Sequence, residues 1–243
     1  MLESIGRLTE LLIEAIKHIF SGKSSTRLTL DQLIRIGIDS LPVAMVTALF
    51  VGMVFAIQIA NEFVKFGAGK VVGGIMAIAV ARELAPALTG IVVAGRVGAA
   101  MAAEIGTMRV TEQVDALQTL GSPPVRYLLV PRLIACVIMF PMLTVLSDIV
   151  GFYGGFFVST MFVKINPGDY IESASSFLKM GDVFGGLAKA AIFGVLVALI
   201  SCYQGLHAKN GAKGVGEATT NAVVYSLISI FIFNYFLSVA FFQ

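Results

Sequence analysis

The chain has 243 residues, of which 57% are hydrophobic and 13% are charged, and its mean hydropathy is +0.90. Soluble domains carry about 25% charged residues, so this composition excludes a soluble globular protein and indicates an integral membrane protein. The net charge of +2 is small and spread along the chain, which argues against nucleic-acid binding.

The apolar segments predict an all-α polytopic membrane protein. They run continuously for long enough to cross about 30 Å of hydrocarbon as helices, whereas a β-barrel would alternate apolar and polar residues over about ten positions. Cys136 and Cys202 lie inside apolar runs without metal-ligand spacing, and we expect buried thiols there and no metal site.

The amino-terminal segment, residues 3–20, predicts an amphipathic helix. Apolar side chains such as Leu8 and Leu12 recur at helical spacing, and charged ones such as Arg7 and Glu14 take the other face. The segment is too charged to span a membrane, so it either lies flat at the membrane surface or packs on the rest of the protein. Residues 1–27 therefore form an interfacial helix and linker, and residues 28–243 form the membrane domain.

The membrane domain contains five predicted spans. Ser40 and Pro42 mark the start of the first, and the third is long enough to need either a kink or an extension beyond the bilayer. The loop at 164–182 contains a stretch that predicts a short surface helix. The spans are Leu41–Ala60, Val71–Gly95, Tyr127–Val163, Val183–Leu206 and Ala222–Phe242.

The basic residues favour a cytoplasmic amino terminus. With that orientation, most arginines and lysines fall in segments on the inside, including Arg96, Arg109, Arg126 and Arg132 between the second and third spans. The carboxyl terminus and the loop at 164–182 then face outside, and the polar segment after the second span is cytoplasmic.

Arg82 and Glu83 lie inside the second span, where an unpaired charge costs a few kcal/mol. They indicate either a polar spot in a cavity for a charged or amphipathic substrate, or internal ion pairs such as Arg82 with Asp148 or Glu83 with Lys189. Pro86 lacks an N–H and frees a backbone carbonyl one turn earlier, so we expect a kink there.

The polar segment at 108–120 predicts a short amphipathic helix. Small residues precede it from Gly90 to Gly106, which favours close helix packing, and Thr111 is placed to cap it. Such a helix either docks into a partner's groove or is an ordinary surface helix. Its apolar side is formed by Val114, Leu117 and Leu120, and its polar side by Glu112, Asp115 and Gln118.

The fifty or so residues RELAPALTGIVVAGRVGAAMAAEIGTMRVTEQVDALQTLGSPPVRYLLVPR, from Arg82 to Arg132, closely resemble the core motif of the MlaE/YrbE family. This family comprises permease subunits of ABC transporters that move phospholipids between membranes alongside MCE (mammalian cell entry) proteins. The first-span sequence FVGMVFAIQ, the amphipathic amino terminus and the number of spans agree with the resemblance.

The resemblance implies a homodimer of permeases in a cell inner membrane, with the carboxyl terminus in the periplasm. A cytoplasmic ABC ATPase would bind through a coupling helix around Glu112 to Leu120, a periplasmic MCE-domain ring would sit above the dimer, and some family members also recruit a STAS-domain protein. Phospholipid would occupy an outward-facing cavity between the two subunits, lined mainly by the first, second and fifth spans. The implied cavity residues are Met53, Phe55, Gln58, Arg82 and Glu83, and the implied coupling residues are Glu104, Arg109, Glu112, Gln113, Asp115, Ala116, Leu117 and Gly121.

The chain shows no Gly-rich phosphate loop ending in Lys-Ser/Thr, so we expect no cofactor and no catalytic residue, with ATP bound by the partner ATPase. Two rival functions stay open. One is an ABC permease for another amphipathic or more polar solute. The other is an ion-coupled secondary transporter that uses Arg82, Glu83, Asp148 and Lys189 as a relay, although no internal repeat supports it.

Overall fold

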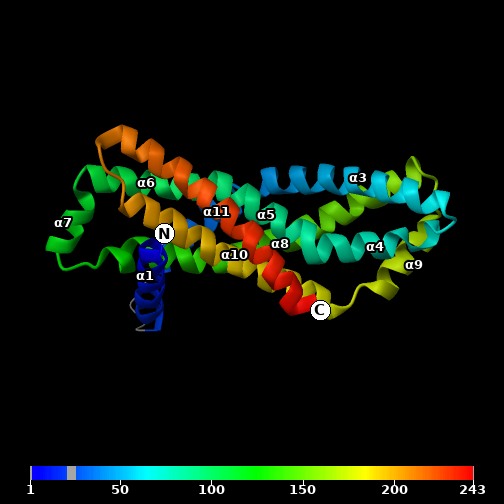
Figure 1. Cartoon of the computed structure of the whole chain (residues 1–243), viewed down its shortest axis with the longest axis horizontal. Helices are drawn as coiled ribbons and strands as arrows, with labels where there is room; N and C mark the ends of the chain where they lie inside the picture. The colour runs from blue at the N-terminus through cyan, green and yellow to red at the C-terminus, as the bar shows by residue number, and fades with distance from the viewer. Residues whose placement is uncertain (1, 21–25, 243) are drawn as a thin grey trace. The chain divides into compact units, whose positions relative to one another are not determined.

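The structure is a computed structural model that describes residues 2–20 and 26–242, and within these ranges it consists of helices joined by short turns and loops, with no β-strand. Figure 1 traces the helices in chain order. They are α1 (Leu2–Phe20), α2 (Thr26–Gly37), α3 (Leu41–Lys65), α4 (Val72–Ala79), α5 (Ala85–Val93), α6 (Ala99–Val110), α7 (Gln113–Thr119), α8 (Val130–Met161), α9 (Pro167–Phe177), α10 (Met180–Leu206) and α11 (Gly211–Phe242).

Five helical segments of the described chain are long and apolar enough to cross a membrane, which confirms the five predicted spans. The second is longer than predicted, because the Ala-rich sequence of α6 continues the helix to Val110. The third is one helical segment with Pro141 inside α8. The segments are Thr26–Lys65, Gly69–Val110, Val125–Met161, Met180–Leu206 and Gly211–Phe242.

Three π-helical turns interrupt these segments: η2 (Val80–Leu84), η3 (Ala94–Gly98) and η4 (Val125–Leu129). π-turns insert one extra residue into an α-helix and re-aim its side chains, and they are frequent at functional sites. Arg82 and Glu83 lie in η2 and Arg96 lies in η3, so three charged residues of the second segment occupy π-helical turns.

The chain divides into two compact units, which are described separately. The first comprises the residues up to Ser40, Gly90–Phe140 and Ala191–Ile232. The second comprises Leu41–Thr89, Pro141–Ala190 and the residues from Phe233 on.

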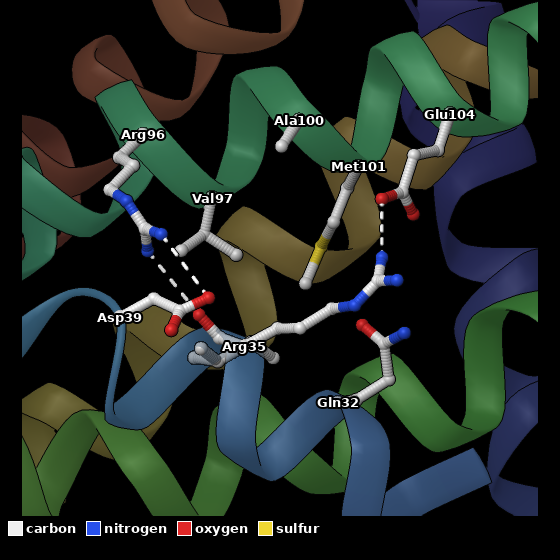
Figure 2. Close-up of a pocket in the computed structure, with 9 residues that line it drawn as sticks. Gln32, Arg35, Asp39, Arg96, Val97, Ala100, Met101 and Glu104 are labelled. Atoms are coloured by element: carbon white, nitrogen blue, oxygen red, sulfur yellow. Dashed lines mark hydrogen bonds and ion pairs between the residues drawn. The ribbon is translucent and has the colours of Figure 1, made fainter.

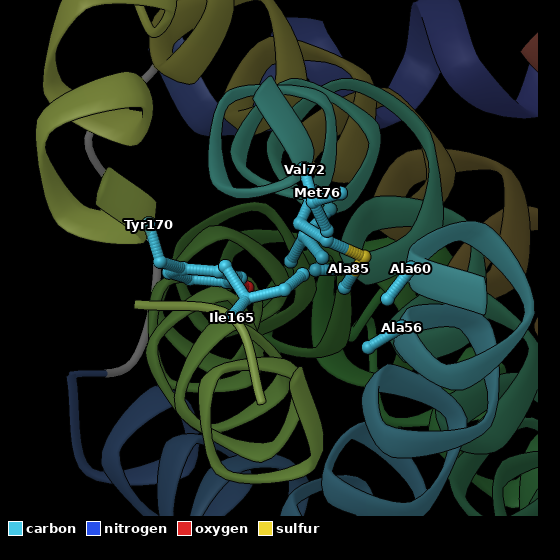
Figure 3. Close-up of a cluster of buried hydrophobic side chains, with 8 residues drawn as sticks. Ala56, Ala60, Val72, Met76, Ala85, Ile165 and Tyr170 are labelled. Carbon is cyan, nitrogen blue, oxygen red and sulfur yellow. The ribbon is translucent and has the colours of Figure 1, made fainter. Parts of the chain in front are cut away.

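In the second unit, small residues bring α3, α4, α8 and α9 into close contact. Ala56 and Ala60 of α3 and Met76 of α4 are fully buried around the ring of Tyr170 from α9 (Figure 3). A Cβ at Gly73 would lie 2.0 Å from the Tyr170 carbonyl oxygen, so only glycine allows α9 to lie this close to α4. The predicted surface helix is therefore packed on the membrane helices.

In the first unit, α1 packs against η4. Ala15 is fully buried, but Ile13 and Ile16 on the same helix are 48% and 41% exposed. The amino-terminal helix therefore packs on the rest of the protein, which was one of the two predicted alternatives. The apolar side chains of Ile13 and Ile16 stay exposed beside this contact. Ser40, expected as a helix cap, instead accepts a hydrogen bond from Arg96 Nη1 at 2.8 Å.

Candidate functional site

The segment before Pro86, where a kink was expected, forms the π-helical turn η2, and two of its carbonyls lie against α10. Pro86 has no N–H to donate, so the Arg82 carbonyl, four residues earlier, loses its α-helical partner, and the Ala81 carbonyl lies next to it. A Cβ at Gly186 would lie 2.1 Å from the Ala81 oxygen, and Lys189 Nζ donates to the Arg82 oxygen at 2.9 Å. Gly186 and Lys189 are about one turn apart on α10, so this helix covers both carbonyls.

The ammonium of Lys189 is the centre of a buried polar network in the second unit. Its side chain is fully buried, and Nζ lies 2.7 Å from Glu83 Oε1 and 2.7 Å from Ser238 Oγ. A Lys ammonium has three donors, and the Arg82 carbonyl, Glu83 and Ser238 use all three. The expected ion pair between Glu83 and Lys189 is therefore present.

The fifth span supplies the rest of the network, which the sequence analysis did not identify. Asn234 Nδ2 donates to Glu83 Oε2 at 2.9 Å, and Ser238 Oγ lies 2.7 Å from Glu83 Oε1. Asn234 and Ser238 are four residues apart in the largely apolar final turns of α11, so they share one face. In the sequence, the spacing of Asn234 and Ser238 was the feature that could have predicted a third helix at this site.

The predicted ion pair between Arg82 and Asp148 is wrong, because the partner of Arg82 is Asp182. Arg82 Nε and Nη2 lie 3.0 Å and 2.8 Å from Asp182 Oδ1, and Asp182 Oδ2 accepts the backbone N–H of Lys179 at 2.9 Å. Asp182 lies in the first turn of α10, which the sequence boundary at Val183 had assigned to the loop. Asp148 Oδ1 has no hydrogen-bond partner among the described residues.

Arg82 and Glu83 border a hollow of about 410 Å³ whose wall is largely apolar. The two cations and two carboxylates of the network balance, so the site has no net charge. The ring of Phe242 lies 4.7 Å from the Arg82 guanidinium and 4.8 Å from Lys189 Nζ, distances at which cations and aromatic rings attract. The other residues that line the hollow are Ile78, Ala79, Tyr235, Ser238 and Val239.

The three expected cavity residues of the first span do not line this hollow. Phe55 packs beside the core cluster of Figure 3, and Met53 packs beside Gly154 of α8. Gln58 is exposed on α3. Within the second unit, the structure therefore brings together Arg82 and Glu83 of the implied set, together with the fifth span.

The implied coupling helix is present as α7, but it starts differently from the prediction. Thr111 does not cap it, because Thr111 closes α6 and its hydroxyl donates to the Thr107 carbonyl. Glu112 precedes α7 with a φ of +60°, and Gly121 follows it with a φ of +72°. Left-handed backbone at both ends turns the chain sharply, so α7 is a separate helix between α6 and η4.

Most side chains of α7 are exposed. Val114 is buried at 2% exposure and Leu117 is half-buried, but Ala116 is exposed and Leu120, just after the helix, is 80% exposed. Gln113 Nε2 donates to Thr111 Oγ1 at 3.1 Å. The apolar side of the predicted helix is thus only partly covered.

The remaining three implied coupling residues, Glu104, Arg109 and Asp115, form ion pairs within the first unit. Arg109 at the end of α6 pairs with Asp115 of α7, which fixes the two helices to each other. Glu104 lies on α6, two turns before α7, and its oxygens pair with Arg35 at 2.7 Å and Arg132 at 2.9 Å. Glu104 thus joins three segments and is not part of the short helix.

Comparison with known proteins identifies the family. A family model described as "Permease MlaE" matches residues 29–240. A probable ABC transporter permease protein of Synechocystis is 52% identical over 226 residues, which cover 93% of this chain and 86% of the relative. A probable ABC transporter permease protein of Rickettsia prowazekii is 44% identical over 99% of this chain and 93% of its own length.

A plant protein is also similar. The Arabidopsis thaliana protein named TRIGALACTOSYLDIACYLGLYCEROL 1, chloroplastic, is 44% identical over 230 residues, which cover 95% of this chain and 66% of that relative. Together with the five apolar helical segments, these matches show that the chain is a multi-pass membrane protein that belongs to the MlaE permease family.

Proposed function

We propose that this chain is the permease subunit of an ABC transporter that moves phospholipids between membranes, energised by a separate ATPase subunit. The observation that carries the proposal is the neutral polar network of Arg82, Glu83, Lys189 and Asp182 at the edge of an apolar hollow. A zwitterionic or weakly charged head group would bind at the polar network, and the acyl chains of the same lipid would lie along the apolar wall. A small polar solute would leave the apolar wall in contact with water.

The wall of the hollow supports an amphipathic ligand. Tyr235 of α11 is 66% exposed, and Val239 one turn later is 40% exposed. Aromatic and aliphatic side chains favour acyl chains, whereas Glu83, whose side chain is 40% exposed, offers an acceptor to a head-group ammonium or hydroxyl. The network thus presents a polar end and an apolar side to one ligand.

The short helix α7 fits a docking element for the ATPase subunit. The exposed Ala116 of α7 and Leu120, just after the helix, lie outside the predicted apolar spans and form an uncovered apolar edge. The ion pair between Arg109 and Asp115 ties α7 to the long second segment, so a force on α7 would act on the helix that also carries Arg82. ATP would be bound by that partner, and this chain would act without a cofactor of its own.

The proposal includes the assembly that the family resemblance implies. A second copy of the chain, a periplasmic MCE-domain protein and, in some systems, a STAS-domain protein would complete the transporter in a cell inner membrane. The amino terminus would be cytoplasmic and the carboxyl terminus periplasmic, as the basic residues between the second and third spans favour. The name of the Arabidopsis relative refers to a galactolipid, which also supports a lipid substrate.

A photo-crosslinking experiment tests the substrate class. With a photoreactive amino acid at Tyr235, the purified transporter should form an adduct with a co-purifying phospholipid, and ATP should lower the yield. The matched control is Phe157 on α8, which is 52% exposed and does not border the hollow, so lipid there should wash out and show no response to ATP. Equal yields at the two positions, or retention of a water-soluble solute at Tyr235, would contradict the proposal.

A further inference from the structure

A second pocket lies in the first unit, and none of its residues borders the hollow beside Glu83. It measures about 280 Å³ and is formed by α2, the turn after it, η3 and α6. Its floor is apolar, since Ile36, Val97 and Met101 are almost fully buried. Its rim is polar, and Figure 2 shows Arg35 reaching toward Glu104 at one end and Arg96 reaching toward Asp39 at the other.

The guanidinium groups at this rim have unused donors. Arg35 donates one hydrogen bond among the described residues, to Glu104 Oε1 at 2.7 Å, and its side chain is 60% exposed. Arg96 Nη1 donates to Ser40 Oγ at 2.8 Å and to the Arg35 carbonyl at 3.3 Å, and Nη2 lies 3.5 Å from Asp39 Oδ2. The Arg96 side chain is 40% exposed. A guanidinium has five N–H donors in a planar fork that matches phosphate oxygens, so both can accept a further anionic partner.

The ion-pair group at the pocket has more positive than negative charges. Arg35 and Arg96, which line the pocket, are matched by Asp39 and Glu104, but Glu104 also pairs with Arg132, a buried residue outside the lining. The group as a whole therefore contains three positive and two negative charges. One positive charge is left over. A phosphodiester group carries one negative charge and would neutralise it.

The arginines of the pocket lie at the ends of the first two apolar spans that the sequence predicts, and apolar residues resume from Val97 to Ala103 before Glu104. Arg35 and Asp39 directly precede the first apolar span, and Arg96 directly follows the apolar run that ends at Gly95. Lipid head groups occupy this level of a bilayer, next to the hydrocarbon. On α2, Ile34 and Ile38 are 52% and 63% exposed, so this helix also offers contact to acyl chains.

We propose that this pocket binds the phosphate of an anionic phospholipid such as phosphatidylglycerol, held between the guanidinium groups of Arg35 and Arg96. The lipid is a bound component of the protein and occupies a site apart from the transport hollow. Its anionic charge distinguishes it from a zwitterionic lipid, which would leave the surplus positive charge in place.

The test uses the full-length chain in nanodiscs with equal amounts of phosphatidylglycerol and phosphatidylcholine. Native mass spectrometry then identifies the lipids that stay bound when the protein is released from the nanodisc. The wild type should retain phosphatidylglycerol several-fold more than phosphatidylcholine. Ala100→Glu adds a negative charge at an exposed position of the pocket without removing any existing ion pair, and it should lower that retention about tenfold. Ala100→Gln, of nearly the same shape, should retain the lipid.

A second pair of variants removes a positive charge. Arg96→Gln should lower retention of phosphatidylglycerol, whereas Lys213→Gln, at an exposed lysine of the same unit, should not. Equal retention of the two lipids by the wild type, or equal retention by Ala100→Glu and Ala100→Gln, would overturn the proposal. Displacement of the lipid by millimolar glycerol phosphate would overturn the assignment to a membrane lipid. None of these readouts depends on transport, so they can fail independently of the proposed function.

Discussion

Replacing Lys189 with methionine tests whether the buried network stabilises the protein as a unit. Methionine keeps most of the volume of lysine but removes the ammonium that joins Glu83, Ser238 and the Arg82 carbonyl. Glu83 then faces the interior of the protein without its counter-charge. Glu83→Gln removes the opposite charge and leaves a fully buried ammonium unpaired.

Breaking one partner of a buried ion pair costs about 3–5 kcal/mol of stability. For Lys189→Met we expect the lower end, about 3 kcal/mol, because Glu83 is 40% exposed and keeps its hydrogen bonds to Asn234 and Ser238. Glu83→Gln should cost at least as much, since Lys189 is fully buried. The double variant should cost no more than the worse single one, because it removes both charges together.

The assay is a double-mutant cycle measured by reversible unfolding in mixed micelles of dodecyl maltoside and sodium dodecyl sulfate. The reasoning predicts a coupling energy of about 3 kcal/mol between the two positions, at the upper end of what contacting residues show. Additive effects, with the double variant losing about 6 kcal/mol, would show that the two charges act independently and would refute the network.

Three further changes follow from single contacts. Gly186→Ala should destabilise by about 2 kcal/mol or more, because its Cβ would meet the Ala81 carbonyl, whereas Gly181→Ala has open space and should change stability little under the same unfolding assay. Ala116→Pro removes the N–H that bonds the Glu112 carbonyl and so breaks the first turn of α7. It should abolish co-purification of the ATPase subunit while membrane insertion persists. Ala116→Ser should keep the ATPase subunit bound. Tyr170→Phe should be neutral or stabilising by about 1 kcal/mol, because the buried hydroxyl has no hydrogen-bond partner among the described residues, and a loss above that in the unfolding assay would contradict the geometry.

Local rules of sequence predicted the features that depend on one helix. The five spans follow from apolar length, and the freed carbonyl of Arg82 follows from Pro86 four residues later. The pair of Glu83 with Lys189 was among the expected alternatives because unpaired charges are costly in a membrane.

The features that depend on helix packing were harder to predict. Arg82 selects Asp182 over Asp148 because of the register of α10 against the second span, which single-helix periodicity does not contain. Glu104 belongs to an ion-pair group with Arg35 and Arg132, which are remote in sequence. Asn234 was visible as a polar residue in an apolar span, but only the fold shows that it meets Glu83.

Transfer of phospholipid driven by ATP tests the central claim most directly. The chain is reconstituted with its ATPase subunit in vesicles that contain a tail-labelled phospholipid. The labelled lipid should move between these vesicles and a partner carrier or acceptor membrane, in either direction, only when ATP is hydrolysed. The account predicts that a non-hydrolysable nucleotide stops this exchange and that Ala116→Pro reduces it to the background level. Exchange at the same rate with and without hydrolysis would contradict the account, as would ATP-driven movement of a water-soluble solute in place of lipid.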